Sequence, residues 1–120
     1  MIRKNGRIER VRLIGVDAPE VQGPYRNAEK GGIESRNVMK ELLDGKDVYL
    51  QGDPVQGAQD RYGRILAYVF RADDRLFVNE EIILRGYATA YRRFHFAHHD
   101  EFVRLEGTAQ AARRGLWSSP

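Results

Sequence analysis

Two segments far apart in the chain carry side chains that together could cleave a phosphodiester. Residues 12–20 (RLIGVDAPE) begin with Arg12 and close a strand-like run with two carboxylates, Asp17 and Glu20. Residues 60–64 (DRYGR) place two arginines and a tyrosine around a glycine. Carboxylates can hold a divalent cation and activate water, and guanidinium groups neutralise the charge that builds on phosphorus. The two segments therefore predict metal-assisted phosphodiester cleavage.

Each side chain of the first segment also has a plainer interpretation. A charge at Arg12, inside an apolar strand, is costly unless it faces an anionic ligand or a carboxylate, but on an edge strand Arg12 would point to solvent. Asp17 could project into a cleft or could form a simple turn before Pro19. Glu20 could act as a general base toward water, or it could be an exposed loop glutamate.

The second segment could be only a turn that leads into a buried strand. A hydrogen-bonded turn needs Gly63, but it does not need Arg64 at the mouth of the strand that follows. The position of Arg64 therefore favours a role that faces a ligand.

Composition predicts a single globular domain covering residues 1–120. Hydrophobic residues make up 42% of the chain and charged residues 31%, as in ordinary globular proteins. No apolar run approaches the length needed to cross a bilayer, so we expect no membrane partner. The first residues are charged without an apolar stretch behind them, so we expect no signal peptide; the compartment stays unknown. The chain has no cysteine, which excludes disulfides and thiolate metal sites.

The charge distribution is compatible with a polyanionic partner. The chain has 20 basic and 17 acidic residues, a net charge of +3, which permits phosphate contacts without requiring them. Basic residues gather at 61 and 64, at 92 and 93, and at 113 and 114, several of them near aromatic residues, a combination that suits nucleotides. The alternative is a solvated basic surface, which we prefer for the last pair because cations complement a helix C-terminus.

The strands and helices that the sequence pattern predicts around these residues indicate an α+β fold, mainly β. Residues 1–4 and 7–16 predict two strands joined in a hairpin at Asn5 and Gly6, and an irregular loop follows over 18–31. A short strand is expected around Val48 and Leu50. Residues 64–70 are apolar on both faces, which is typical of a strand at the centre of a barrel or sandwich. Helical periodicity and glycine stops predict three helices, over 33–43, 78–85 and 100–114.

The chain resembles the staphylococcal nuclease (thermonuclease) family over essentially its whole length. Four stretches match in order and approximate spacing: 11–20 (VRLIGVDAPE), 60–64 (DRYGR) with 66–68 (LAY), 78–79 (VN) with 85–88 (RGYA), and 109–118 (AQAARRGLWS). The resemblance implies an OB-fold, a five-stranded barrel with three helices. It also implies a calcium-dependent endonuclease that hydrolyses DNA and RNA to 3′-phosphate ends.

The family's catalytic and metal-binding residues can be carried over by position. Arg12 and Arg64 resemble the two arginines that bind the scissile phosphate and its transition state. Glu20 resembles the proposed general base. Asp17 resembles a Ca²⁺ ligand, and Ala18 stands where the family often has threonine and would offer its backbone carbonyl.

Three more residues resemble the family's substrate-binding positions. Arg61 and Tyr62 resemble a lysine–tyrosine pair that holds a neighbouring phosphate, and Tyr91 corresponds to a tyrosine that contacts a base or a phosphate. Because a cleft that reads a phosphate and a stacked base does so more easily on unpaired nucleotides, we expect single-stranded DNA and RNA to be preferred.

One part of the family pattern is missing from this sequence. Members carry, before the hairpin, a further strand with an Asp-Gly-Asp-Thr turn whose second aspartate is another calcium ligand. Three explanations are open: a truncated sequence or mis-assigned start, a strand supplied by a second copy through self-association at the exposed barrel edge, or a domain that has lost full activity. With Asp17 as the remaining carboxylate ligand, we expect weak calcium affinity. The alternative to a nuclease is a catalytically impaired module that binds nucleic acid or protein.

Overall fold

The computed structural model describes residues 2–4, 7–19 and 30–118. Among them it contains three α-helices, a 3₁₀ helix and seven short strands, which confirms the predicted α+β class. None of these helices has the length and apolar character that crossing a membrane requires. The elements are β1 (Ile2–Lys4), β2 (Arg7–Glu9), β3 (Val11–Leu13), β4 (Val16–Asp17), α1 (Gly32–Leu43), β5 (Val48–Gln51), β6 (Ile65–Arg71), α2 (Val78–Leu84), β7 (Thr89–Ala90), α3 (His99–Ala111) and η1 (Gly115–Trp117).

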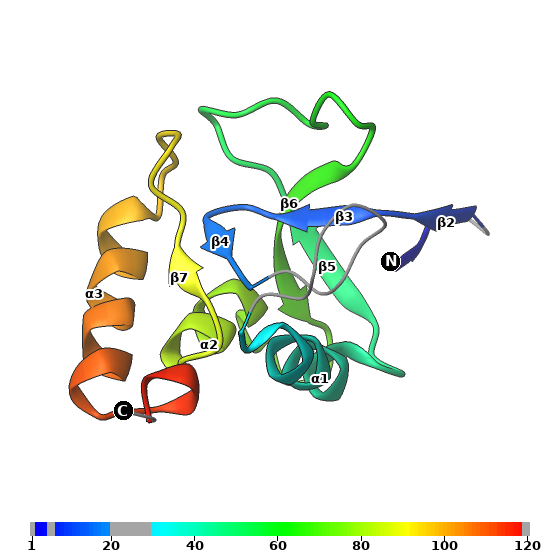
Figure 1. The fold of residues 1–120 in the computed structure, drawn as a ribbon. Coiled ribbons are helices and arrows are strands. Elements are labelled where there is room, and N and C mark those ends of the chain that lie inside the picture. The colour runs from blue at the N-terminus through cyan, green and yellow to red at the C-terminus, as the bar shows by residue number, and fades with distance from the viewer. Residues whose placement is uncertain (1, 5–6, 20–29, 119–120) are drawn as a thin grey trace.

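The described strands form three small sheets and not a closed five-stranded barrel. The hairpin β1–β2 is antiparallel, as predicted, with its turn at residues 5–6 outside the described residues. β6 is the central strand of the order β3-β6-β5, as its two apolar faces predicted, and β4 pairs with β7. β3 runs parallel to β6 with Arg12 opposite Leu66 (Figure 1), so this pairing brings the two predicted arginine segments together.

The strand predicted over 7–16 is divided into three, and this prediction was wrong in its continuity. At Gly15 the backbone has φ +78°, and a Cβ there would lie 2.4 Å from the Phe96 ring. Only glycine accepts both the left-handed conformation and the close ring. The turn at Gly15 redirects the chain, so β3 pairs with β6 while β4 pairs with β7.

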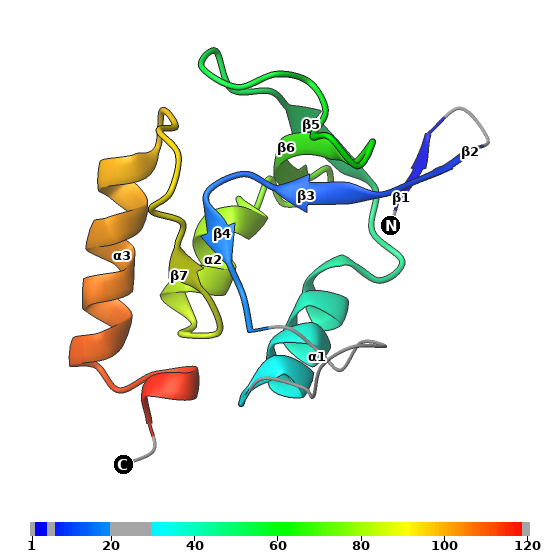
Figure 2. The same ribbon diagram turned by 45° about the horizontal axis from the view of Figure 1, so that its top comes forward.

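The helices pack beside and beneath the sheets, with α3 on the side opposite the hairpin and α1 below the strands (Figures 1 and 2). α2 contacts β6, α1 and α3, and α3 lies beside β7 (Figures 1 and 2). The core between these elements includes fully buried Ile82, Phe96 and Phe102. The buried amide of Asn79, on α2, donates to the carbonyl of Ile14 at 2.9 Å and accepts from the N–H of Val69 at 2.9 Å. It therefore links the turn after β3 to β6.

The last helix ends earlier than its sequence pattern predicted. α1 and α2 lie close to their expected bounds, but α3 stops at Ala111 and not at Arg114. Arg113 has φ +54°, a left-handed conformation that ends the helix before the glycine, and Gly115 begins η1. The stop signal was therefore read two or three residues too late, which is an ordinary error for helix ends.

Candidate active site

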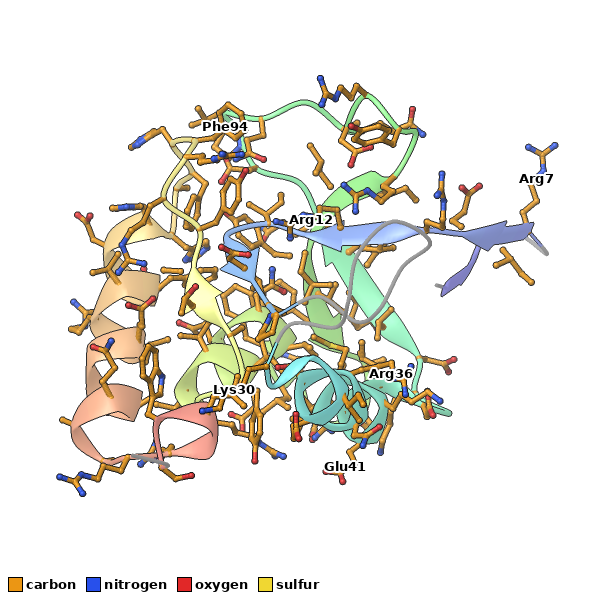
Figure 3. All side chains as sticks on the ribbon, viewed as in Figure 1. Arg7, Arg12, Lys30, Arg36, Glu41 and Phe94 are labelled. Carbon is orange, nitrogen blue, oxygen red and sulfur yellow. The ribbon has the colours of Figure 1, made fainter. Side chains whose placement is uncertain are left out.

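Five of the predicted site residues line one cleft, of about 470 Å³, which we call the arginine cleft. It lies between β3, the loop that joins β5 to β6, and the loop that follows β7, and Figure 3 shows Arg12 and Phe94 on this side of the molecule. Its polar and aromatic lining comprises Arg12, Gln56, Asp60, Arg61, Tyr62, Arg64, Tyr91, Arg93 and Phe94.

Arg12 is half-buried and held by neutral groups. Its Nη1 donates to the carbonyls of Leu13 at 2.8 Å and Val16 at 2.7 Å. Its guanidinium carbon lies 5.4 Å from the centre of the Tyr91 ring, a cation–π distance. The described contacts of Arg12 therefore include no carboxylate, and two backbone carbonyls fix the direction of its guanidinium.

Arg64 is held by Asp60 within a tight turn. The Arg64 Nε donates to Asp60 Oδ2 at 2.6 Å, and Asp60 Oδ1 accepts the backbone N–H groups of Tyr62 and Arg64, each at 2.9 Å. Gly63 takes φ +78°, as the turn prediction required. Partial burial disfavours the charged form of Asp60, but these hydrogen bonds outweigh it and hold the pKa of the carboxyl below its ordinary 3.8. Asp60 thus orients Arg64 as an ionised carboxylate.

Arg61 and Tyr62 form an exposed pair on the same wall. Arg61 Nη2 donates to the Tyr62 hydroxyl at 2.9 Å, and its guanidinium carbon lies 5.0 Å from the centre of the Tyr62 ring. The Arg64 guanidinium lies 5.7 Å from the same ring. An exposed ring between two cations combines stacking surface with positive charge, the pairing that suits a nucleotide.

The opposite wall is aromatic and is fixed by a buried carboxylate. The rings of Tyr91 and Phe94 lie 5.9 Å apart, and Phe94 is 65% exposed. Asp53 is buried and accepts from the backbone N–H of Ala97 at 2.8 Å and from that of Val55 at 2.7 Å. Asp53 therefore ties together the two loops that face each other across the cleft.

The basic pair Arg92 and Arg93 divides into two different roles. Arg92 forms a two-pronged ion pair with Glu106 on α3, with both nitrogen–oxygen distances at 2.9 Å, so its charge is used within the fold. Arg93 lines the arginine cleft. The basic pair predicted from the sequence thus contributes one guanidinium to the cleft.

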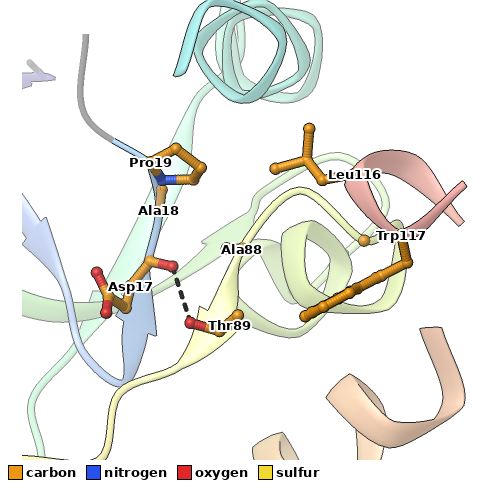
Figure 4. Close-up of a pocket in the computed structure, with 8 residues that line it drawn as sticks. Asp17, Ala18, Pro19, Ala88, Thr89, Leu116 and Trp117 are labelled. Carbon is orange, nitrogen blue, oxygen red and sulfur yellow. Dashed lines mark hydrogen bonds between the residues drawn. The ribbon is translucent and has the colours of Figure 1, made fainter. Parts of the chain in front are cut away.

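Asp17 and Ala18 line a separate, smaller pocket of about 210 Å³. Asp17 ends β4, is exposed, and its backbone carbonyl accepts from the Thr89 hydroxyl at 3.3 Å (Figure 4). Trp117 lines the same pocket from η1. The Val16 carbonyl bound by Arg12 belongs to the peptide unit that precedes Asp17, so Arg12 and Asp17 are connected through one peptide. Glu20 lies outside the described residues.

The donors at Asp17 fit calcium in kind but not in number. A carboxylate and a backbone carbonyl are hard oxygen ligands of the type that Ca²⁺ takes, but the ion needs six to eight. Within residues 7–19 and 30–118, no group of three or more acidic, histidine or cysteine side chains could hold a metal. Because the described residues supply few of these ligands, oxygens of water and of the substrate phosphate would have to supply most of them.

Asp60 and Phe94 are cleft residues that the sequence did not single out for a role, whereas Arg93 belongs to the basic pair at 92 and 93. Asp60 had a signal, because an aspartate at the start of a turn commonly accepts backbone N–H groups of that turn. Phe94 had none, because its approach to the cleft depends on the pairing of β4 with β7.

Comparison with known proteins agrees with this architecture. Residues 10–119 match the family described as "Staphylococcal nuclease homologue". The chain is 36% identical to "Probable staphylococcal-like nuclease CAN3" of Oryza sativa subsp. japonica, over 92% of the chain and 26% of that protein. It is 30% identical to "Thermonuclease" of Staphylococcus hyicus, over 99% of the chain and 69% of that protein. It is also 36% identical to an "Uncharacterized endonuclease" of Escherichia coli, over 91% of the chain and 63% of that protein. The chain thus spans between about a quarter and two thirds of these relatives' length, and it belongs to the staphylococcal nuclease homologue family.

Proposed function

We propose that this chain is a nuclease that hydrolyses phosphodiester bonds of DNA and RNA, with calcium as its cofactor and 3′-phosphate ends as its products. The observation that carries the proposal is the convergence of Arg12 and Arg64 on one cleft, each held by groups of the fold. Membership of the nuclease homologue family supports the same reading.

Arg12 and Arg64 are proposed to bind the scissile phosphate. When water attacks phosphorus and the 5′-oxygen leaves, negative charge accumulates on the phosphoryl oxygens. Two guanidinium groups already oriented by backbone carbonyls and by Asp60 stabilise that charge without reorganising during the reaction. Loss of one such donor commonly costs about 10²- to 10³-fold in turnover.

Arg61, Tyr62 and Tyr91 are proposed to bind the adjoining nucleotide. The Arg61–Tyr62 pair offers charge to a phosphate, and exposed rings on both walls offer stacking surface to a base. Stacking on both walls needs a base that is free of its partner strand, so single-stranded substrate is preferred. Equal rates on native and heat-denatured DNA would contradict this preference.

Asp17 and the Ala18 carbonyl are the proposed calcium ligands, with water and substrate oxygens completing the shell. A bound Ca²⁺ would neutralise the phosphate and polarise its P–O bonds. Glu20 is proposed as the general base that takes a proton from the attacking water, a role carried over from its place in the family motif. Because the residues that the structure describes offer few calcium ligands, half-maximal activity should need high calcium concentrations.

The test is degradation of heat-denatured DNA by the wild-type chain with calcium and with chelator. Arg64→Ala and Glu20→Gln are compared with Arg36→Gln, a matched loss of charge on the exposed side of α1, far from the cleft in Figure 3. We expect calcium-dependent cleavage that leaves 5′-hydroxyl ends, a roughly 10²-fold loss or more for Arg64→Ala, and wild-type rates for the control. Unchanged turnover in both Arg64→Ala and Glu20→Gln would overturn the assignment.

A binding module without catalysis is the second candidate. The position of Asp17, which lines the smaller pocket and not the arginine cleft, favours it. Such a module would retain its affinity for single-stranded oligonucleotides in chelator, would cleave none of them, and would be indifferent to Glu20→Gln.

A further inference from the structure

The hairpin at the start of the chain extends away from the body of the molecule. Its two strands, with residues 2–4 and 7–10, are here called the basic arm. Their principal contacts among the described elements are with each other, and the arm points to the side opposite α3 in both ribbon views (Figures 1 and 2). Among the described elements, the arm therefore packs little against the core.

The composition of the basic arm is strongly cationic. Its residues include four basic side chains, at positions 3, 4, 7 and 10, and one acidic side chain, Glu9. Arg7 and Arg10 are exposed, and Figure 3 places Arg7 near the outer end of the arm. Ile8 between them is 66% exposed, so the arm also presents one apolar side chain at its surface.

The basic arm is continuous with the arginine cleft. Arg10 Nη2 donates to the backbone carbonyl of Tyr62 at 2.9 Å, and the Arg10 carbonyl accepts from the N–H of Ile65 at 2.9 Å. Because side chains alternate along an extended chain, Arg10 and Arg12 share a face roughly 7 Å apart, whereas Arg7 falls on the other face, roughly 17 Å from Arg12. The basic side chains are thus spaced outward from the cleft along β2, on both sides of the strand.

We propose that the basic arm is an extension of the substrate site that binds the phosphates of a single-stranded polynucleotide beyond the nucleotide being cleaved. The proposal rests on the proposed nuclease function for the identity of the strand in the cleft. A cationic line favours a polyanion, and exposed Ile8 offers apolar contact to a sugar or an unpaired base. The chain should therefore be a nuclease of polymers, whose affinity grows with substrate length until the arm is covered.

The test compares a trinucleotide with a single-stranded DNA of about 16 nucleotides, the upper range for one OB fold. The variants are Arg7→Gln and Arg7→Gln combined with Arg10→Gln, and the matched control is Arg36→Gln on α1. Binding of the longer DNA is measured by fluorescence anisotropy in chelator, between about 50 and 200 mM salt. Cleavage of both lengths is measured with calcium.

For the long DNA, each lost contact should reduce the slope of log affinity against log salt by about 0.7, and the double variant should weaken binding on the order of tenfold at low salt. KM for the long DNA should rise with little change in kcat, while both constants for the trinucleotide stay at wild-type values. Affinities of Arg7→Gln and of the double variant equal to that of Arg36→Gln would overturn the proposal. An equal loss on both lengths in the double variant would also overturn it, because Arg10 would then act only by holding the Tyr62 turn.

The two proposals fail in different ways. A wild-type chain that cleaves neither length refutes the nuclease, and the anisotropy measurement in chelator still tests the basic arm. A chain that cleaves both lengths but shows no effect of Arg7→Gln on the longer DNA refutes the arm alone. Light scattering tests whether the chain forms dimers. If the affinity for DNA rises with protein concentration because dimers form, the arm mediates contact between copies, and its role in binding substrate is overturned.

Discussion

Replacing Asn79 by alanine should strongly destabilise the fold. The Asn79 side chain is fully buried, accepts from the Val69 N–H at 2.9 Å and donates to the carbonyls of Ile14 at 2.9 Å and Ala67 at 3.3 Å. Ala67 keeps a second partner, because its carbonyl also accepts from the Ile14 N–H at 3.0 Å. Truncation therefore leaves two buried backbone groups, the Val69 N–H and the Ile14 carbonyl, without a hydrogen bond.

The expected loss follows from those two groups. Each buried group left unsatisfied costs about 1–3 kcal/mol, so Asn79→Ala should lower the free energy of unfolding by about 2–6 kcal/mol. That is a large share of the roughly 5–15 kcal/mol that stabilises a domain of this kind. Because the Ile14 carbonyl follows β3, the loss falls on the segment that holds Arg12.

Urea unfolding followed by far-UV circular dichroism measures this change. Asn37→Ala, on the exposed face of α1, is the matched control and should be neutral or slightly stabilising because alanine is the better helix former. Asn79→Asp keeps the acceptor for Val69 but sets a carboxylate against two carbonyls, so it should be about as damaging as alanine. A loss below about 1 kcal/mol in Asn79→Ala would refute the reasoning, because it would mean that the two groups found other partners.

Three further changes test the geometry of the site and of the core. Asp60→Asn keeps the turn's acceptor but turns an N–H toward the Arg64 guanidinium, so steady-state kcat should fall by about tenfold, less than in Arg64→Ala; equal kcat in Asp60→Asn and the wild type would show that Arg64 needs no orientation. Gly15→Ala should lower the melting temperature strongly, because a Cβ at φ +78° would lie 2.4 Å from Phe96, and an unchanged melting temperature would exclude that contact. Burial alone would raise the pKa of Asp53, but hydrogen bonds from the Tyr68 hydroxyl and three backbone N–H groups hold it below the ordinary 3.8. The stability from this carboxylate is therefore complete above that value and is lost as the pH falls through the lower folded-state pKa, so Asp53→Asn should flatten the acid limb of a stability–pH curve.

The elements that the sequence predicted well are those whose pattern repeats over many residues. Helix α1 follows from an apolar stripe at helical spacing, and β6 follows from six residues, 65–70, that are apolar on both faces. The break of the 7–16 strand at Gly15 depends on the Phe96 ring, which is distant in sequence. Local pattern could not reveal a contact of that kind.

The sequence identified the main residues of the candidate site, but it did not identify the groups that orient their side chains. Arg12 and Arg64 were identified from their place in two motifs, but the groups that orient them were not. Arg12 is held by backbone carbonyls, which every residue has, so no sequence signal marks them. The separation of Asp17 from the arginine cleft arises from the turn between β3 and β4, whose direction only the three-dimensional structure defines.

The arginine cleft can form only after β3 has paired with β6 during folding. Arg10 and Tyr62 are in contact although they are 52 positions apart in the sequence, and contacts of such separation form late because the loop between them must first close. A chain emerging from the ribosome displays Arg12 long before β6 is available to bring Arg64 beside it. Under the proposed function, RNA-cleaving capacity therefore arises only once the β3–β6 pairing has closed.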